Sequence, residues 1–256
     1  MISKNLLKLI RSLESKKGRR KEGLFVAEGP KVVGDLIRHQ TPVRLIGTEE
    51  WFCDSGWQPR ADVDERVSAD ELRRISFLQH PQQVVGIFRL LDQQLPNDFT
   101  GDRCSRQLTL ALDGIQDPGN LGTIIRIADW FGISDIVCSS DTADVYNPKV
   151  VQATMGSLAR VNIFYTNLPS WLRQLPSSLP VYGTLLDGEN LYGQPLASAG
   201  IIVMGNEGNG ISEEVRGLVS HRLLIPSFHH ADEHAESLNV AIATAIVCAE
   251  FRRRSS

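Results

Sequence analysis

Five polar residues that could bind or orient a ligand lie in three short segments, each of which begins with an apolar run. The segment "LDGIQDPGNLGTIIRIADWFG" contains Asn120 and Arg126, "IIVMGNEGNGIS" contains Glu207, and "LLIPSFHHADEHAESLNV" contains Ser237 and Asn239 near its end. In open α/β sheets, ligands bind where the carboxyl ends of strands meet such loops. We therefore expect the three segments to converge on one site.

The glycines of these segments do not match a phosphate-binding loop. "GNEGNG" is not followed by Gly-Lys-Ser or Gly-Lys-Thr, as in a Walker loop, and it lacks the G-x-G-x-x-G spacing of dinucleotide-binding folds. Because Gly-rich turns are common, this turn taken alone is only a weak sign of ligand contact. Neither ATP nor NAD is supported as a ligand.

Alternating strands and helices are expected to position the three segments. From residue 108 onward, apolar strands such as "LTLALDGI" and "GIIVMGNEG" alternate with helical stretches, the last of which begins near Val240. This alternation predicts a parallel sheet that helices cover on both faces. The helix from Val240 is apolar on nearly every face, so we expect it to be buried.

The first part of the chain predicts a smaller α/β domain. Apolar residues recur at helical spacing in 3–15, "LFVAEG" is typical of a strand, and Ser68 with Glu71 predicts a capping box before a helix. "PVRLIGTEE" is typical of a strand followed by a turn, and a polar stretch without periodicity separates the two halves. The predicted organisation is a domain at 1–95, a linker at 96–107 and a second domain at 108–256.

Positive charge is concentrated near the start of the chain. Residues 1–31 contain nine Lys and Arg against three acidic residues, a net charge of +6, so with a total of −3 the remaining chain carries −9. The run "KKGRRKEG" at 16–23 has five cations in its first six positions. A solvated loop is the ordinary explanation, but the position between a helix and an apolar segment favours contact with RNA or DNA phosphates. The predicted phosphate-binding residues are Lys16, Lys17, Arg19 and Arg20.

The composition is that of an ordinary globular protein. Of 256 residues, 42% are hydrophobic and 22% charged; the sequence has no run of about 18 apolar residues, and its basic start lacks the apolar core of a secretory signal. The four cysteines lack metal-like spacing and are expected to be free thiols in the cytoplasm. His229, His230 and His234 could bind a metal, but a solvated polar loop is the simpler explanation. We predict no metal and no membrane span.

Taken together, the three segments resemble the SpoU branch of the SPOUT methyltransferases, which are RNA ribose 2'-O-methyltransferases that use S-adenosylmethionine. The resemblance lies in ordered motifs: an Asn with an Arg six residues later, the turn at 203–210, and Ile-Pro followed by Ser-Leu-Asn-Val. "YNPKVVQATMGSLARV" is similar to the family's segment between its first two motifs. The stretch "KNLLKLIRSLESKKGRRKEGLFVAEGPKVV" resembles the ribosomal-protein-like substrate-binding domain that often precedes such enzymes.

The resemblance implies a trefoil-knotted, parallel-sheet α/β domain, preceded by a small α/β RNA-binding domain, in a homodimer whose active sites use both subunits. A knot is an exception to the general absence of threaded chains. S-adenosylmethionine would lie within the knot, and the helix from Val240 would pack in the knot and against the second subunit. The cofactor-binding residues carried over from the family are Thr184, Leu185, Gly205, Asn206, Ile225 and Leu238.

The resemblance also gives catalytic roles to Asn120, Arg126, Glu207, Ser237 and Asn239. Because a guanidinium stays protonated, we expect Arg126 to bind a phosphate or stabilise a developing alkoxide, while the proton leaves through a phosphate oxygen, Ser237 or water. A simple helix N-cap is the structural alternative for Ser237. The ten residues 227–236 form a longer cofactor loop than is usual in the family.

The RNA substrate is suggested only indirectly. Ribosomal RNA is favoured over transfer RNA because the first domain resembles a ribosomal protein. Two other functions stay open: a methyltransferase acting on a ring nitrogen of a base, and a non-catalytic RNA-binding protein of ribosome assembly that keeps the fold. The presence of all five candidate catalytic residues favours an enzyme over the second.

Overall fold

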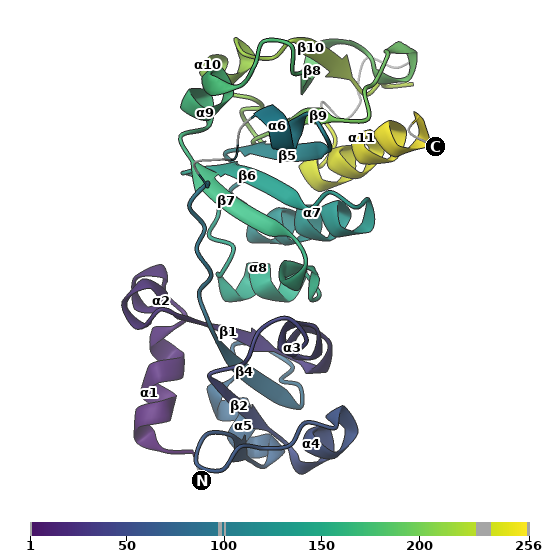
Figure 1. The fold of residues 1–256 in the computed structure, drawn as a ribbon. Helices are drawn as coiled ribbons and strands as arrows, with labels where there is room; N and C mark the ends of the chain where they lie inside the picture. The colour runs from purple at the N-terminus through teal and green to yellow at the C-terminus, as the bar shows by residue number, and fades with distance from the viewer. Residues whose placement is uncertain (1, 97–98, 100, 229–236, 255–256) are drawn as a thin grey trace. The chain divides into compact units, whose positions relative to one another are not determined.

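A computed structural model describes residues 2–96, 99, 101–228 and 237–254 (Figure 1). The chain divides into two compact units, one formed by Met1–Asp92 with Asp144–Ala159, the other by Gln93–Ala143 with Arg160–Ser256. The chain therefore passes between the units three times. The second unit differs from the predicted second domain in two ways: the segment Asp144–Ala159 belongs to the first unit, and the predicted linker at 96–107 belongs to the second unit.

The first unit is built on a four-stranded mixed sheet in the order β1-β4-β2-β3. β4 is antiparallel to β1 and to β2, whereas β2 and β3 are parallel. Every residue of β1 is buried, as in a strand that is covered on both faces. The strands are β1 (Leu24–Glu28), β2 (Arg44–Gly47), β3 (Glu65–Arg66) and β4 (Val84–Arg89). The helices are α1 (Lys4–Ser12), α2 (Lys16–Glu22), α3 (Pro30–Ile37), α4 (Glu49–Ser55), α5 (Ala69–Ile75), α8 (Pro148–Ala153) and η1 (Ser157–Ala159).

Capping residues decide where the short helices of this unit begin. The predicted capping box is confirmed, since the Ser68 hydroxyl accepts from the Glu71 N–H and the Glu71 carboxylate accepts from the Ser68 N–H. The sequence predicts a turn after β2, but Thr48 caps a further helix, α4. The basic run forms α2, which Ser15 caps at its start and Gly23 ends with a φ of 67°.

The second unit is built on a six-stranded sheet in the order β10-β8-β9-β5-β6-β7, and every pairing between these strands is parallel. This confirms the predicted parallel sheet. The strands are β5 (Leu108–Asp113), β6 (Asp135–Ser139), β7 (Asn162–Thr166), β8 (Val181–Asn190), β9 (Gly200–Gly205) and β10 (His221–Leu224). The helices are α6 (Gly101–Cys104), α7 (Pro118–Trp130), α9 (Leu168–Gln174), η2 (Leu191–Gly193), α10 (Glu213–Arg216) and α11 (Val240–Arg254).

β5 and β9 lie side by side at the centre of this sheet. They pair from Leu108 with Gly200 to Asp113 with Gly205, and all six residues of each strand are buried. β6 and β7 lie on one side of this pair, and β8 and β10 lie on the other. The loops that follow β5 and β9 therefore meet where the connections diverge to opposite sides, which is where open α/β sheets bind ligands.

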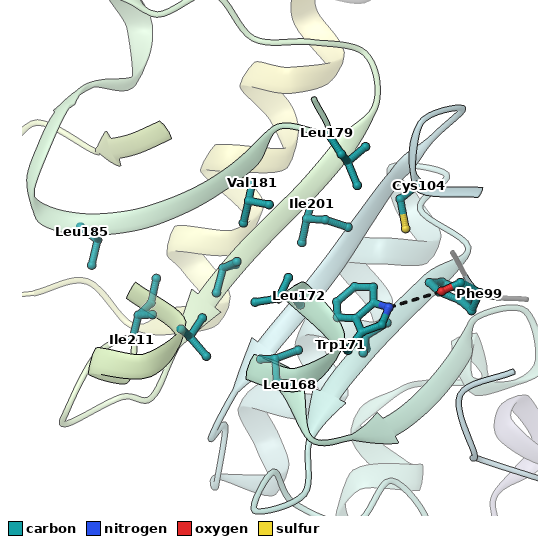
Figure 2. Close-up of a cluster of buried hydrophobic side chains, with 14 residues drawn as sticks. Phe99, Cys104, Leu168, Trp171, Leu172, Leu179, Val181, Leu185, Ile201 and Ile211 are labelled. Atoms are coloured by element: carbon teal, nitrogen blue, oxygen red, sulfur yellow. Dashed lines mark hydrogen bonds between the residues drawn. The ribbon is translucent and has the colours of Figure 1, made fainter. Parts of the chain in front are cut away.

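Helices cover both faces of this sheet, as the alternating pattern predicts. One face packs against α9 and α10 in a core that includes Trp171, whose indole N–H donates to the Phe99 carbonyl at 3.4 Å (Figure 2). α7 and α11 pack against each other, and they contact β6 and β9 respectively. Because successive strand residues point to opposite faces, the strands β5, β6 and β9, which are buried throughout, bury both sets of side chains.

α7 and α11 run side by side in the same direction (Figure 1). Near their starts, Asn239 donates a hydrogen bond to Asn120, and near their ends the Arg252 guanidinium donates to the Phe131 carbonyl at 2.7 Å. The predicted burial of the last helix is confirmed for half of its apolar residues, whereas others are partly exposed and Ile242 is 54% exposed.

The buried carboxylate at the start of β6 generates a stability prediction. The side chain of Asp135 is fully buried and accepts hydrogen bonds from the Arg103 guanidinium, at 2.6 and 2.8 Å, and from two side-chain amides. Asp135→Ala removes the common acceptor, and we expect chemical denaturation to show a loss of about 3 kcal/mol. The control Asp102→Ala breaks an exposed pair with Arg106 and should cost less than about 1 kcal/mol. Equal, small losses would contradict the prediction.

Candidate active site

Three of the predicted site residues form a continuous series of hydrogen bonds. The Asn239 Nδ2 donates to Asn120 Oδ1 at 2.9 Å, and the Asn120 Nδ2 donates to Glu207 Oε1 at 3.0 Å. Asn120 lies in the first turn of α7, Glu207 follows β9, and Asn239 immediately precedes α11. The predicted convergence of the three segments is therefore confirmed.

Asn239 also caps α11, and this fixes the direction of the series. Its Oδ1 accepts from the backbone N–H groups of Ala241 and Ile242 at 3.0 and 3.3 Å, so its Nδ2 is directed to Asn120. These N–H groups belong to the first turn, which has no carbonyl partners within its own helix. Ser237, for which a cap is the structural alternative, is exposed and has no hydrogen bond to its side chain from the described residues.

The loop after β9 is held in shape by Asn206. Its Oδ1 accepts from the Gly208 and Asn209 N–H groups at 2.9 and 3.0 Å, and its Nδ2 donates to the Gly114 carbonyl, after β5, at 2.6 Å. A Cβ on Gly205 would lie 2.3 Å from the Gly210 carbonyl carbon, so only glycine permits this tight turn. Asn206 and Gly205, predicted as cofactor-binding residues, therefore also build the loop that presents Glu207.

Asp113 makes a second link between the two central strands. This buried residue ends β5, and its Oδ2 accepts from the Ser212 N–H, which precedes α10, at 2.7 Å. Together with the bond from Asn206 to Gly114, the link ties the loop after β5 to both ends of the loop after β9. Asp113 is not among the residues predicted from the sequence, although a single carboxylate at the end of the apolar run "LTLALD" is a signal of it.

Arg126 is not part of the hydrogen-bonded series. It lies six residues after Asn120 on α7, about 9 Å farther along the helix axis at 1.5 Å per residue. Its side chain is exposed, and no described residue forms a hydrogen bond or an ion pair with it. The guanidinium is therefore available to a ligand, but the structure does not place it against Asn120, Glu207 or Asn239.

The predicted cofactor residues Thr184 and Leu185 lie in a bulge of β8. The pairing with β10 passes from Gly183 directly to Glu189, so residues 184–188 leave the ladder. The Thr184 hydroxyl donates to the Val203 carbonyl at 3.3 Å, and Leu185 is buried in the core (Figure 2). The side chains of both residues thus face the protein, which leaves backbone groups of the bulge for a ligand.

Apolar side chains are exposed at the same edge of the sheet. Leu186, in the bulge, is 78% exposed, and Phe228, which follows β10, is 79% exposed. Leu238 precedes α11 and is 50% exposed, whereas Ile225, directly after β10, is partly buried. The bulge of β8 and the connection from β10 to α11 therefore offer apolar surface to a ligand.

The predicted phosphate-binding run divides into exposed and buried cations. Lys16, Lys17 and Arg20 are exposed on α2, but Arg19 is only 2% exposed. Its guanidinium donates to two backbone carbonyls and pairs with Asp144 at 2.6 Å. The prediction of a phosphate contact for Arg19 is corrected accordingly, because its donors are directed into the first unit.

The buried cysteines are not activated as nucleophiles. All four are free thiols, as predicted, and three are buried. Burial raises the pKa of the Cys248 thiol to about 12 and also raises the pKa of the Cys138 thiol, so both stay protonated at neutral pH.

Among the described residues no group of three potential metal ligands occurs, and no helix is long and apolar enough to cross a membrane. The predicted loop with His229, His230 and His234 lies outside the described residues.

The fold and the site define an α/β protein whose candidate site lies where the central strands of a parallel sheet diverge, the usual place for ligands in this class. Comparison with known families agrees with this class. Residues 107–249 match the SpoU rRNA Methylase family, and residues 4–86 match the MRM3-like substrate binding domain. The chain belongs to the SpoU rRNA methylase family.

Individual relatives match nearly the whole chain. The 23S rRNA (guanosine(2553)-2'-O)-methyltransferase RlmP of Bacillus subtilis is 29% identical over 245 residues, which cover 94% of both chains. A Porphyromonas gingivalis structure described as a TrmH-family RNA methyltransferase has a TM-score of 0.86 and 41% identity, with 99% of both chains covered. The AdoMet-bound rRNA methyltransferase from Sinorhizobium meliloti has a TM-score of 0.82 and 31% identity, covering 99% of this chain and 96% of that one. The predicted family and α/β fold are confirmed.

Proposed function

We propose that this protein is an S-adenosylmethionine-dependent methyltransferase that methylates a ribose 2'-OH of ribosomal RNA in the cytoplasm. The observation that carries the proposal is the series Asn239–Asn120–Glu207 at the carboxyl ends of the central strands, in a chain of the SpoU family. The relative RlmP, named as a 23S rRNA methyltransferase, supports ribosomal RNA over transfer RNA. The free thiols suit a reducing compartment.

The carboxyl edge of the sheet suits an adenosyl cofactor that carries no phosphate. Its exposed Leu186, Phe228 and Leu238 can cover the apolar face of an adenine, and the bulge of β8 offers backbone donors and acceptors. When bound, S-adenosylmethionine supplies a methyl group on a sulfonium. We propose a trefoil knot with α11 as the threaded segment. The proposed cofactor contacts are Thr184, Leu185, Gly205, Asn206, Ile225 and Leu238.

In this proposal the hydrogen-bonded series orients the ribose. Transfer to a 2'-OH requires its oxygen to be aligned with the methyl group and its proton to be removed. Glu207 Oε1 is occupied by Asn120, and Glu207 Oε2 lies 3.5 Å from the Asn206 amide. A carboxylate held between two amides is suited to accepting a ribose hydroxyl in a fixed direction. We therefore assign Glu207 to orientation.

Arg126 is proposed to act on the RNA through charge. Its guanidinium is exposed and has no partner among the described residues, so it can bind a phosphate beside the target ribose or stabilise developing negative charge on the 2'-oxygen. Because a guanidinium stays protonated, it does not take the proton. A phosphate oxygen, water or the exposed Ser237 hydroxyl would relay that proton away.

Substitution of Arg126 tests this function. Arg126→Ala should lower the rate of methyl transfer to ribosomal RNA by about 10²–10³-fold without loss of folding, because the side chain has no structural partner. Arg126→Lys keeps the charge but loses the planar fork, so an intermediate rate is expected. Transfer of labelled methyl measures the rate, and Arg106→Ala, in an exposed pair of the same unit, is the control.

Nuclease P1 digestion and mass spectrometry identify the product of the same reaction. A 2'-O-methylnucleoside is expected, whereas a methylated ring nitrogen would show the alternative base methyltransferase. A protein that binds RNA but gives no product with ribosomal or transfer RNA would favour the ribosome-assembly alternative. Near-normal turnover of the Arg126→Ala variant would remove Arg126 from the mechanism.

The exposed cations of α2 are proposed to bind RNA phosphates. Replacing Lys16, Lys17 and Arg20 together by Gln should weaken RNA binding and lower the slope of log K against log salt by about 2–3, at about 0.7–0.9 per phosphate contact. The control replaces three exposed arginines of the second unit that already pair with acids: Arg106, Arg173 and Arg222. An unchanged slope in the α2 variant would exclude these phosphate contacts.

We also propose a homodimer that buries the outer surface of α7 and α11. Trp130 on α7 is 85% exposed and Ile242 on α11 is 54% exposed, so these two helices, which pack against each other, both offer apolar side chains to a partner. Ile242→Arg should shift the mass measured by sedimentation equilibrium from dimer to monomer. Leu91→Arg, at an exposed apolar residue of the first unit, should leave the mass unchanged. A monomeric wild-type protein would disprove the dimer.

A further inference from the structure

The first unit contains a segment from the middle of the methyltransferase sequence. The segment Asp144–Ala159 connects β6 to β7, two strands of the second unit. Its contacts nevertheless group it with the first unit. These residues lie inside the range 107–249 that matches the SpoU family, and outside the range 4–86 that matches the substrate binding domain. The substrate-binding unit is therefore completed by residues from the other part of the chain.

Residues 144–159 make specific packing contacts within the first unit. The ring of Tyr146 lies 4.6 Å from that of Phe25 in β1, and its hydroxyl accepts from the Leu91 N–H at 2.9 Å. Burial raises the pKa of Tyr146 to about 12, in keeping with an enclosed phenol. A Cβ on Gly156 would lie 2.2 Å from an Asp35 carboxylate oxygen, so the end of the segment closely approaches α3. Both ends of the segment thus have specific contacts.

Asp144 pairs with the one buried cation of the basic run. Arg19 is 2% exposed, and its Nη2 lies 2.6 Å from Asp144 Oδ2. Its Nη1 donates to the Leu13 and Glu14 carbonyls, at the end of α1, at 2.9 and 2.7 Å. Its Nε is buried and has no hydrogen-bond partner among the described residues. Asp144 is therefore the only described carboxylate that compensates this buried charge.

α2 needs such an anchor because its own sequence opposes a stable helix. It has only seven residues, fewer than an isolated helix requires in water. Five of the seven are cations, whose mutual repulsion across successive turns is destabilising. Gly18 lets the helix approach the end of α1 so closely that a Cβ there would lie 1.8 Å from the Ser12 carbonyl oxygen. Tertiary contacts, among them the Arg19–Asp144 pair, must therefore hold α2 in place.

We propose that Asp144 is a substrate-positioning residue, which acts through Arg19 to hold α2 so that Lys16, Lys17 and Arg20 bind RNA phosphates together. The inference rests on the proposed phosphate-binding function of α2. It assigns to the SpoU-type sequence a part in RNA binding that does not involve the methyl-transfer site. The carboxylate of Asp144, in the connection between β6 and β7, thereby determines how the exposed cations of α2 are arranged for RNA binding.

The test compares Asp144→Asn with the triple Gln variant of Lys16, Lys17 and Arg20, alone and combined, in the full-length protein. Asp144→Asn removes the charge that holds Arg19 but leaves all three exposed cations in place. We expect about a tenfold loss of RNA affinity and a lower salt slope, because the cations no longer bind phosphates together. Adding Asp144→Asn to the triple variant should change affinity and slope little further, since both act on the same contacts.

A purely structural role for Asp144 gives a different result. Reduced folding would lower the fraction of active protein without changing the salt slope, and its effect would add to that of the triple variant; this outcome would overturn the proposal. Asp144→Glu keeps the carboxylate and should restore much of the slope. Asp70→Asn, at an exposed pair with Arg73 in the same unit, should have no effect.

The same measurements separate this inference from the proposed function on which it rests. If the triple variant binds RNA with an unchanged slope, α2 does not bind phosphates, and both proposals fail. If the triple variant lowers the slope but Asp144→Asn does not, α2 binds RNA without the help of Asp144, and only the inference fails. Should Asp144→Asn not fold, Arg19→Lys, which keeps the charge but loses the fork, provides the same comparison with the triple variant.

Discussion

The parallel pairing of β5 with β9 is the interaction on which the rest of the second unit depends. The two strands are distant in sequence, yet they pair along their whole length at the centre of the sheet. Their loops are then joined by Asp113 to Ser212 and by Asn206 to Gly114, and only this double link places Glu207 within reach of Asn120. The parallel packing of α7 and α11 adds Asn239 from a third segment. The series of hydrogen bonds gains its direction in this way, because each of its three side chains also has a second partner.

The basic run shows how one local sequence can serve two purposes. Its exposed cations are available to a polyanion, whereas Arg19 is directed inward and satisfied by backbone carbonyls and by Asp144. A buried charge is tolerated only when it is paired, so the position of α2 depends on a residue far away in sequence. The division into units follows the same logic: the segment from Asp144 to Ala159 joins the first unit because its apolar ring and its carboxylate have their partners there.

Local patterns predicted most elements of this fold. The alternation of apolar strands and helices predicted the parallel sheet, and the capping box at Ser68 was read directly from residue types three positions apart. α2 and α4 were missed, because a run of cations and a short turn carry little apolar periodicity, and tertiary contacts override weak local preference. The convergence of Asn120, Glu207 and Asn239 was predicted from polar segments that each follow an apolar strand, and the family resemblance gave these residues their roles. The capping role of Asn239 and the link made by Asp113 were not predicted. Both depend on which backbone N–H group the fold places beside the side-chain oxygen.

The sequence by itself determined the fold class, the family and the residues able to do chemistry, because hydrophobic periodicity and ordered motifs are properties of the chain alone. Only the tertiary structure decided which of those residues meet. It joined Asn120 to Glu207 and Asn239, left Arg126 apart and exposed, and buried Arg19 against Asp144. The physical reason is that burial and hydrogen-bond direction are set by the packing of segments distant along the chain, and residue type does not encode that packing locally.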